Sequence, residues 1–338
     1  MFFVPSVTPG LTGHLPLSRD LADYPDGIVL PVDKPYRWTS ADVIRKLKYA
    51  AIKHFGKKNL KVGHAGTLDP LATGVLLVCI GPACKRAQEL QDHDKEYIAR
   101  ICFGATTPSY DLEKEVDRQF PFEHITREAV QAALPGFLGE QEQVAPLFSA
   151  KSVDGVRAYE LARKLYKAHL ASSVAPGPDR ESQFDAAALD TLHRSRIVIS
   201  ELELLGFEAG RHALPGACAP PHKGRGRGPL DTSSVGTQET MGGAGVEQSE
   251  TESSGRACLP ASASASSRIH VADTSALGLP EAVVHIACSK GTYIRAFARD
   301  LGEALGSGAH LSGLIRSRSG SFRLENALSL DQALALLQ

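Results

Sequence analysis

Short apolar runs recur along this chain and predict more strands than helices. Residues 27–32 (G-I-V-L-P-V) and 75–80 (V-L-L-V-C-I) are almost uninterrupted apolar runs with the length of buried strands. In residues 95–104 apolar and polar positions alternate, as in a strand with one buried face. The same pattern predicts strands at residues 196–207, 282–288 and 311–322, and an extended segment at 143–149.

Helical spacing is clearest after Thr39 and Ser40, either of which can cap a helix that extends to about Phe55. From Val43 onward an apolar residue returns at every fourth position of this segment. Shorter helices are predicted at residues 126–134, 155–167, 291–305 and near the C-terminus. Because strands outnumber helices and do not alternate regularly with them, we expect an α+β fold with a mixed or antiparallel central sheet flanked by helices.

Composition divides the chain into one folded domain with additions. Residues 1–26 are rich in Pro, Gly and Asp, which predicts a loose N-terminal leader. Two low-complexity insertions are expected at about 169–189 and 208–267; the second has almost no large apolar residues, so we expect it to be disordered. The folded domain then spans residues 27–323, and residues 324–338 form a short C-terminal helix.

Charge and cysteine content exclude several classes of protein. The formal net charge is −1, so any surface that binds nucleic acid must be local. Residues 34–61 hold nine Lys or Arg and one acid, which makes this stretch a candidate for phosphate binding. The six cysteines include no C-x-x-C pair, so we expect no metal site and a reduced, cytoplasmic protein. No signal peptide and no apolar run long enough to span a membrane is recognisable.

The stretch most suggestive of chemistry is residues 61–77 (K-V-G-H-A-G-T-L-D-P-L-A-T-G-V-L-L). Its glycines let the backbone bend and let a ligand approach closely, and its one acid, Asp69, precedes a proline and a buried strand. Such a loop can present a single carboxylate in a cleft. An ordinary Asp-Pro turn explains this stretch equally well when it is taken alone.

Seven stretches in a fixed order resolve that ambiguity. They are D-K-P with T-S (33–35, 39–40), the G-H-A-G-T-L-D-P-L-A-T-G-V-L loop (63–76), K-E-Y (95–97), F-S-A (148–150), G-V-R-A-Y-E-L-A-R (155–163), C-S-K-G-T-Y-I-R (288–295) and S-G-A-H-L-S-G-L (307–314). Together they resemble the TruB family of tRNA pseudouridine synthases, over residues 27–206 and 281–323. The resemblance implies the pseudouridine synthase catalytic fold and the isomerisation of uridine 55 in the T-loop of tRNA.

The resemblance also implies a role for each matching residue. Asp69 matches the catalytic aspartate, which attacks the ribose C1′ or acts as a base at C2′. The target uridine must be flipped out of its stack to reach this carboxylate. Tyr97 matches the tyrosine that stacks on the flipped base and is a candidate for removing the C5 proton; without the resemblance, an ordinary strand aromatic is favoured. Arg295 matches the arginine that pairs with the aspartate and keeps it ionised.

Other matches concern substrate binding. Tyr293 and Leu314 match residues that pack around the target base, and His64 matches a histidine that helps to expel it, although a lone histidine in a loop is more often structural. Lys34 and Lys290 are expected to contact phosphate or to support the loops. Arg157 and Tyr159 are expected to shape the RNA cleft.

The chain departs from the family pattern at three points. Arg37 stands where many members have glycine after the D-K-P motif, so that turn must avoid positive φ or strain a non-glycine residue. A C-terminal RNA-binding PUA domain is not apparent, and the 208–267 insertion has no counterpart in the family pattern.

The expected partner is tRNA, bound through its T-arm by a monomer without an obligatory protein partner, and no cofactor is expected. A single loop acid also argues against a two-carboxylate glycoside hydrolase. Two alternatives stay open: a tRNA-binding or tRNA-folding protein on the same fold, and a synthase that acts on a different RNA uridine, including a guide-RNA-directed target. The presence of Asp69, Tyr97 and Arg295 favours the enzyme, since binding alone does not require all three.

Overall fold

The computed structural model describes residues 3–5, 16–146, 152–153, 156–157, 194–210 and 269–338. The chain divides into two compact units, one formed by Met1–His212 with Ser264–Gln338 and the other by Ala213–Ala263. The second unit lies outside the described residues. The expected insertions lie outside them too, apart from residues 208–210.

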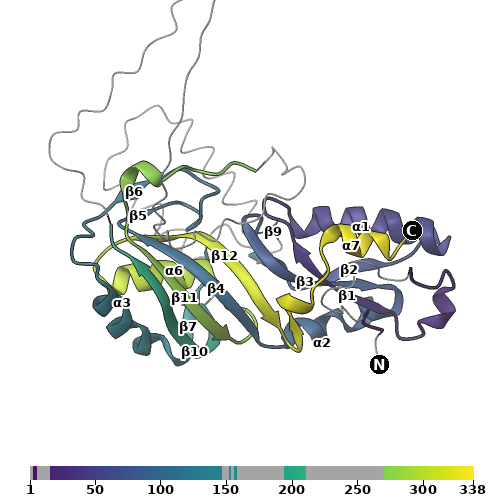
Figure 1. The fold of residues 1–338 in the computed structure, drawn as a ribbon. Coiled ribbons are helices and arrows are strands. Elements are labelled where there is room, and N and C mark those ends of the chain that lie inside the picture. Colours follow the sequence, from purple (N-terminus) through teal and green to yellow (C-terminus); the bar gives the residue numbers. More distant parts are fainter. Residues whose placement is uncertain (1–2, 6–15, 147–151, 154–155, 158–193, 211–268) are drawn as a thin grey trace, which may run out of the picture. The chain divides into compact units, whose positions relative to one another are not determined.

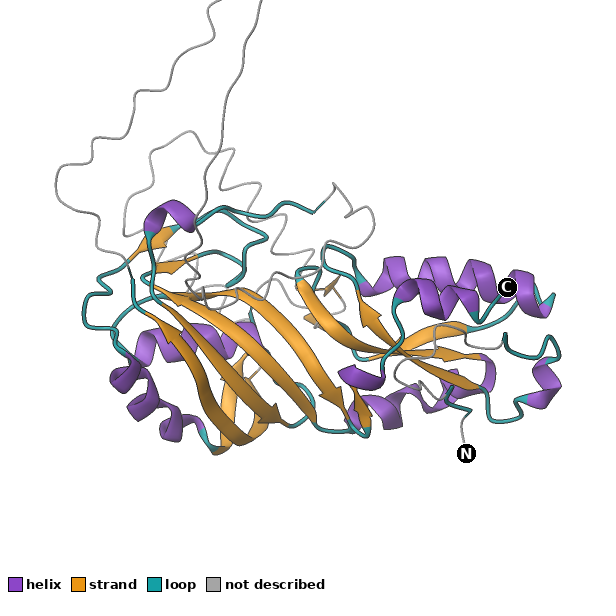
Figure 2. Cartoon of the chain, viewed as in Figure 1, coloured by secondary structure: helices purple, strands orange, loops and turns teal. Residues whose placement is uncertain are grey.

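A central sheet organises the described unit (Figures 1 and 2). The strands of the described residues are β1 Ile28–Lys34, β2 Val62–Ala65, β3 Ala72–Ile80, β4 Lys95–Phe103, β5 Ala105–Thr106, β6 Arg118–Gln119, β7 Gly139–Val144, β8 Ser152–Val153, β9 Val156–Arg157, β10 Arg194–Glu208, β11 Glu281–Cys288, β12 Ala309–Ser319 and β13 Phe322–Arg323. The sheet runs in the order β1-β3-β12-β4-β11-β10-β7, with β2 beside β3 and β13 beside β12. β3 and β12 pair in parallel and the other neighbours pair antiparallel, which confirms the mixed sheet.

The residue pattern explains which strands are buried on both faces. In β1 and β3, alternate side chains enter two different hydrophobic clusters, one on each face of the sheet. These strands therefore read as continuous apolar runs, whereas in β4 the polar Arg100 is exposed between the buried Ala99 and Ile101. The strands predicted around residues 196–207 and 282–288 pair directly as β10 and β11, so the chain between them is inserted between sheet neighbours.

Short helices cover the sheet. They are α1 Ser40–Phe55, α2 Ala87–Asp92, α3 Arg127–Ala133, α6 Ile294–Ala304 and α7 Leu330–Ala335, with 3₁₀ turns η1 Leu21–Asp23, η2 Gly81–Arg86, η3 Leu134–Phe137, η4 Ser275–Leu277 and η5 Leu324–Asn326. Thr39 caps α1 in a capping box with Asp42, and Thr126 caps α3, as the sequence predicts. Across the residues described, no helix combines the length and apolarity needed to cross a membrane.

Both ends of the chain pack more tightly than expected. The N–H of Phe3 donates to the carbonyl of Gly27 (3.2 Å) and that of Val29 to the carbonyl of Phe3 (3.0 Å), while Leu17 and Tyr24 are buried in the main hydrophobic cluster. The prediction of a loose leader is therefore wrong for its described part. Apolar residues scattered among Pro, Gly and Asp suffice to anchor it. The C-terminal α7 likewise packs against α1 and β1 and belongs to the same core.

Three predicted elements differ in their bounds. α6 begins at Ile294, because Gly291 takes a φ of +81° in the preceding turn. Of the extended segment expected at 143–149, only Gln143 and Val144 belong to a strand, the end of β7; residues 145–146 are in no element and 147–149 lie outside the described part. The helix expected at 155–167 starts instead with β9, which pairs with β8, and its other residues lie outside the described part.

Candidate active site

Asp69 lies on the loop between β2 and β3, at the N-terminal end of α1. The first residue of α1, Ser40, holds this loop through its hydroxyl, which accepts from the N–H of Leu68 (3.0 Å) and donates to the carbonyl of Leu68 (3.2 Å). The N–H of Ala72 donates to the carbonyl of Asp69 and closes the Asp-Pro turn at the start of β3. The Asp69 side chain remains 35 % exposed. The loop is fixed, and the carboxylate faces partly outward.

Arg295 pairs with Asp69 in a bidentate geometry. Its Nε donates to Oδ2 of Asp69 at 2.9 Å and its Nη2 donates to Oδ1 at 3.0 Å, while Nη1 donates to the carbonyl of Ser109 at 3.0 Å. The Arg295 side chain is only 6 % exposed. The predicted pairing is thus present, and its two hydrogen bonds fix the orientation of the Asp69 carboxylate. Burial alone would lower the pKa of Arg295, but the carboxylates of Asp69 and Asp111 outweigh it and raise that pKa.

A second carboxylate, Asp111, lies on the other side of Arg295. Its Oδ2 is 3.8 Å from Nε of Arg295, and its Oδ1 accepts from the Ser109 hydroxyl (2.6 Å) and from the N–H of Glu113 (2.9 Å). Sequence reasoning missed this residue and treated T-T-P-S-Y-D only as a turn. The site therefore holds a second acid besides Asp69. An acid that ends a polar, proline-containing turn was the available signal.

Glu113 also faces this cluster. Burial, and next the charge of Asp111, raise its pKa to about 7, whereas Arg295 opposes the shift. The N-terminal segment of α6 is held in turn by Gln143 of β7, whose side chain accepts from the N–H of Tyr293 (2.8 Å) and donates to its carbonyl (3.1 Å). Strands far apart in the sequence therefore fix the arginine and its acids together.

Tyr97 on β4 is opposite Arg316 on β12 in the sheet, and the guanidinium of Arg316 also bonds to its hydroxyl. Tyr97 is only 8 % exposed, and burial raises the pKa of that hydroxyl. Arg316 itself is buried; its Nε donates to the carbonyl of Val75 (2.7 Å) and its Nη2 to that of Gly66 (3.1 Å). Sequence reasoning gave Arg316 no role. Arg316 joins Tyr97 to the Asp69 loop. The sequence could have indicated this, because Arg316 follows Leu314 by two residues and side chains two apart in a strand lie on the same face.

Lys34 supports the loop from beneath and is not a surface residue. It is fully buried, and its Nζ donates to the carbonyls of Pro35 (3.0 Å), Trp38 (2.5 Å) and Pro70 (3.1 Å). The expectation of a phosphate contact is wrong in this geometry, since a buried ammonium held by three carbonyls has no donor left for RNA. Burial lowers its pKa to about 7, against the charges of Asp69 and Asp33.

The turn after Lys34 settles the question raised by Arg37. Arg37 has a φ of 61°, so a non-glycine residue does occupy the left-handed region here. Its guanidinium donates to the carbonyl of Ile269, a contact that glycine could not make.

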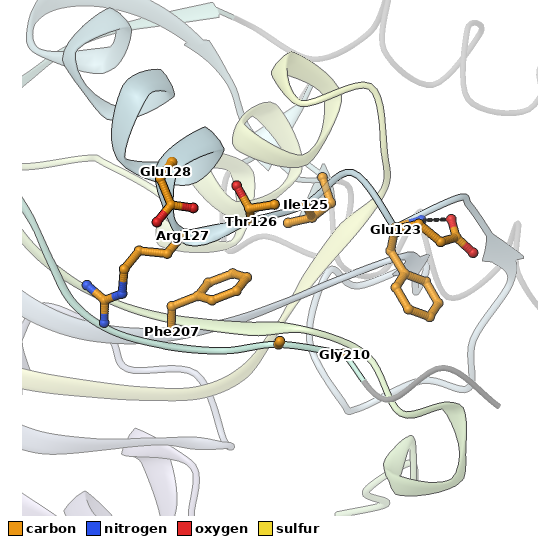
Figure 3. Close-up of a pocket in the computed structure, with 9 residues that line it drawn as sticks. Glu123, Ile125, Thr126, Arg127, Glu128, Phe207 and Gly210 are labelled. Atoms are coloured by element: carbon orange, nitrogen blue, oxygen red, sulfur yellow. Dashed lines mark hydrogen bonds between the residues drawn. The ribbon is translucent and has the colours of Figure 1, made fainter. Parts of the chain in front are cut away.

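A pocket opens beside the Asp69–Arg295 pair. Its lining residues come from the Asp69 loop, the Asp111 turn, α6 and β12: Asp69, Leu71, Ala72, Asp111, Arg295, Leu311, Ser312, Gly313 and Leu314. Leu314 is therefore in the pocket wall, as expected. A second hollow, between α3 and the end of β10, is lined by Ile125, Arg127 and Phe207 among others and shares no residue with this pocket (Figure 3).

The remaining predicted residues lie around this centre. His64 on β2 is half-buried, its Nδ1 has no hydrogen-bond partner among the described residues, and burial followed by the charge of Arg316 lowers its pKa. Tyr293 is the N-cap residue of α6. Lys290 is exposed and pairs with Asp92 at 3.1 Å. The side chains of Arg157 and Tyr159, and residues 148–150, lie outside the described part.

Within the described residues, no group of three or more His, Cys, Asp or Glu side chains is placed to hold a metal ion. The site presents the partly exposed carboxylate of Asp69 beside a small pocket. The buried Tyr97 and the buried side chains of Arg295 and Arg316 lie behind it.

Comparison with known proteins agrees with these features. Residues 52–174 match the family model described as TruB family pseudouridylate synthase (N terminal domain). The chain is 41 % identical over 309 residues to tRNA pseudouridine synthase B of Phocaeicola vulgatus, covering 91 % of this chain and 92 % of that protein. It is 36 % identical to tRNA pseudouridine synthase B of Thermus thermophilus, covering 89 % and 75 %.

Among solved structures, a chain of a Cbf5-Nop10-Gar1 complex matches with a TM-score of 0.49 and 20 % identity, covering 96 % of this chain and 59 % of that one. We draw no conclusion from a similarity at that level. The two sequence relatives, each matched along most of its length, are sufficient: the chain belongs to the TruB family of pseudouridine synthases.

Proposed function

We propose that this enzyme converts uridine 55 in the T-loop of tRNA to pseudouridine, with Asp69 as the catalytic carboxylate. The observation that carries the proposal is the bidentate Asp69–Arg295 pair at the edge of a pocket. The arginine points the carboxylate at the space where a flipped nucleotide would enter. The relatives described above are named as tRNA pseudouridine synthases, which supports tRNA as the substrate.

The reaction needs only groups that this site supplies. The N1–C1′ bond of the uridine breaks, the uracil turns, and a C5–C1′ bond forms; C5 loses a proton and N1 gains one, so atoms balance without an external donor. Asp69 attacks C1′ or removes a proton from C2′. Tyr97 and Leu314 would pack against the flipped base, and stacking on an aromatic ring contributes about 1–3 kcal/mol, which offsets much of the cost of flipping.

The test is tritium release from T-loop transcripts labelled at uracil C5, with wild type compared with Asp69→Asn. We expect release by the wild type and none by the variant, while binding of the transcript changes little. The matched control is Asp331→Asn, which removes an exposed acid in the first turn of α7 and should retain full activity. A transcript with cytidine at position 55 should release no tritium.

Other results would favour the alternatives. Release by Asp69→Asn at the wild-type rate would remove Asp69 from the mechanism. Tight binding without any release would favour a tRNA-folding protein, and release that persists with cytidine at position 55 would indicate a different target uridine.

A further inference from the structure

The solvent face of α1 is strongly basic. Val43, Leu47 and Ala51 of this helix are buried against the core, so the other side of the helix faces outward. That side and the turn after it expose one aromatic residue and five lysines. We call this set the α1 lysine surface: Lys46, Lys48, Tyr49, Lys53, Lys57 and Lys58. Figure 1 shows α1 on the outside of the sheet beside α7.

Most of these charges are not neutralised by the protein. The only acid of α1, Asp42, caps the helix and pairs with Arg45 at 2.7 Å. Lys46 lies over the ring of Trp38, 5.4 Å from its centroid. In the part of the chain that the structure describes, the other four lysines of the surface have no ion pair. In a chain with a net charge of −1, this is a concentrated local excess of positive charge.

The surface continues into a hollow at the C-terminal end of α1. Lys57 lines this hollow together with Lys61 and Lys85. Two acids, Asp20 and Asp23, lie at the neighbouring η1, where they accept from the N–H of Ala22 and the hydroxyl of Ser18, and the three lysines of the hollow outnumber them. The basic region therefore extends beyond the helix itself.

The helix that carries this surface begins beside the candidate active site. Ser40, at the start of α1, bonds to Leu68, the residue before Asp69. A helix of 16 residues is about 24 Å long, at roughly 1.5 Å per residue. The lysines thus follow a path that starts at the Asp69 loop and leads away from it. Tyr49 lies on this path and is 77 % exposed, which is unusual for a side chain of that size without a partner.

We propose that the α1 lysine surface binds the sugar-phosphate backbone of the RNA substrate, outside the nucleotide that enters the pocket. Free lysine ammonium groups suit phosphates, whose neutralisation releases counterions, and an exposed tyrosine offers a stacking face. RNA is favoured over an acidic protein because the helix that carries the surface begins at the loop beside the pocket that would receive a nucleotide. This inference rests on the proposed function, since it assigns a second contact to the same substrate.

The test removes three lysines that make no contact with the pocket. In the variant Lys53→Ala, Lys57→Ala, Lys58→Ala we expect the Kd for full-length tRNA to rise at least about tenfold near 0.1 M salt. The slope of log Kd against log salt concentration should become shallower by about 2, because each lost phosphate contact removes about 0.7–0.9 from it. KM should rise in parallel, whereas kcat at saturating tRNA should stay near the wild-type value.

The matched control carries the same loss of three charges elsewhere. Arg127, Arg196 and Arg323 are exposed on α3, β10 and β13, and their triple change to alanine should alter the Kd less than twofold. Thermal unfolding of both variants checks that they are folded. A wild-type Kd and salt slope in the lysine variant would overturn the proposal, and so would an equal loss in the control.

The two proposals can fail separately. If the wild type releases no tritium but the lysine variant still loses affinity, the enzymatic assignment fails and the RNA surface stands. If the wild type is active and the lysine variant binds tRNA normally, the surface assignment fails alone.

Discussion

Arg295 is the residue on which the candidate site depends. Its guanidinium is almost fully buried, and each of its three nitrogens donates a hydrogen bond: Nε and Nη2 to Asp69, and Nη1 to the carbonyl of Ser109, with Asp111 nearby. A buried cation with such partners is well satisfied, while removal of one partner leaves an uncompensated charge. The arrangement therefore orients Asp69 without needing rigidity in the loop itself.

The fork geometry of Arg295 matters more than its charge. Arg295→Lys keeps the charge but cannot reproduce two parallel hydrogen bonds to Asp69, so the carboxylate loses its fixed direction. We expect kcat to fall by about 100-fold, the loss typical of a small misplacement of a reacting group, with little change in KM. Single-turnover kinetics with tRNA measures both.

The control for this change is Arg127→Lys, on an exposed site of α3, which should behave as wild type. Arg295→Lys with unaltered kcat would show that charge alone suffices and that bidentate aiming is unimportant.

Among the elements, the parallel pair of β3 and β12 brings the site together. Gly74 of β3 is opposite Arg316 of β12, and the N–H of Gly74 also donates to the Asp33 carboxylate at 3.0 Å. Gly74 has a φ of +99°, and a Cβ built there would lie 2.3 Å from the carbonyl oxygen of Arg316. This position therefore requires glycine for two separate reasons, the backbone conformation and the close approach of the neighbouring strand.

Gly74→Ala should consequently destabilise the protein. Left-handed strain costs about 1–3 kcal/mol, and overpacking against a strand adds about 1–3 kcal/mol, so we expect the free energy of unfolding to fall by about 2–6 kcal/mol. Urea denaturation measures this quantity.

Gly63→Ala provides the comparison, because its new Cβ would meet nothing within 4 Å and no positive φ is needed there. It should change stability by less than about 1 kcal/mol. Equal effects of the two substitutions would refute the role given to the β3–β12 contact.

At the scale of the whole molecule, the site couples stability to pH. Glu113 faces Asp111, Asp69 and Arg295, and also influences Lys34; its pKa is raised to about 7 from an ordinary value of 4.5. Between pH 4.5 and 7 the unfolded chain loses this proton while the folded chain keeps it. The contribution of Glu113 to stability therefore falls as pH rises through that window and is constant above it.

Glu113→Gln removes this dependence. Relative to wild type, the variant should gain stability from pH 5 to pH 7.5, by about 1–3 kcal/mol. Urea denaturation at a series of pH values gives the difference, with the exposed Glu201→Gln on β10 as the control. A difference between wild type and Glu113→Gln that stays flat across this range would contradict a raised pKa.

Much of the fold could be predicted because it is encoded locally. Thr39 with Asp42 caps α1 through neighbours three residues apart, and the apolar run of β3 reflects burial of both its faces. The prediction of a loose leader failed because composition and packing disagree in that segment. Its Pro, Gly and Asp content is typical of a loop, but Leu17 and Tyr24 anchor it in the core. Composition describes an average, whereas two well-placed apolar side chains are enough to bind a segment to a core.

The sequence by itself determined the strands, the helix caps, the order of the family motifs and the candidates Asp69, Tyr97 and Arg295. Only the tertiary structure decided which side chains meet. Arg295 is 226 positions from Asp69, and Asp111 joins them from a third stretch of the chain. The same holds for Lys34, whose charge indicated a surface contact until burial and three carbonyl partners were seen. Periodicity and capping depend on near neighbours, but contacts between distant residues depend on sheet register and burial, which no single segment contains.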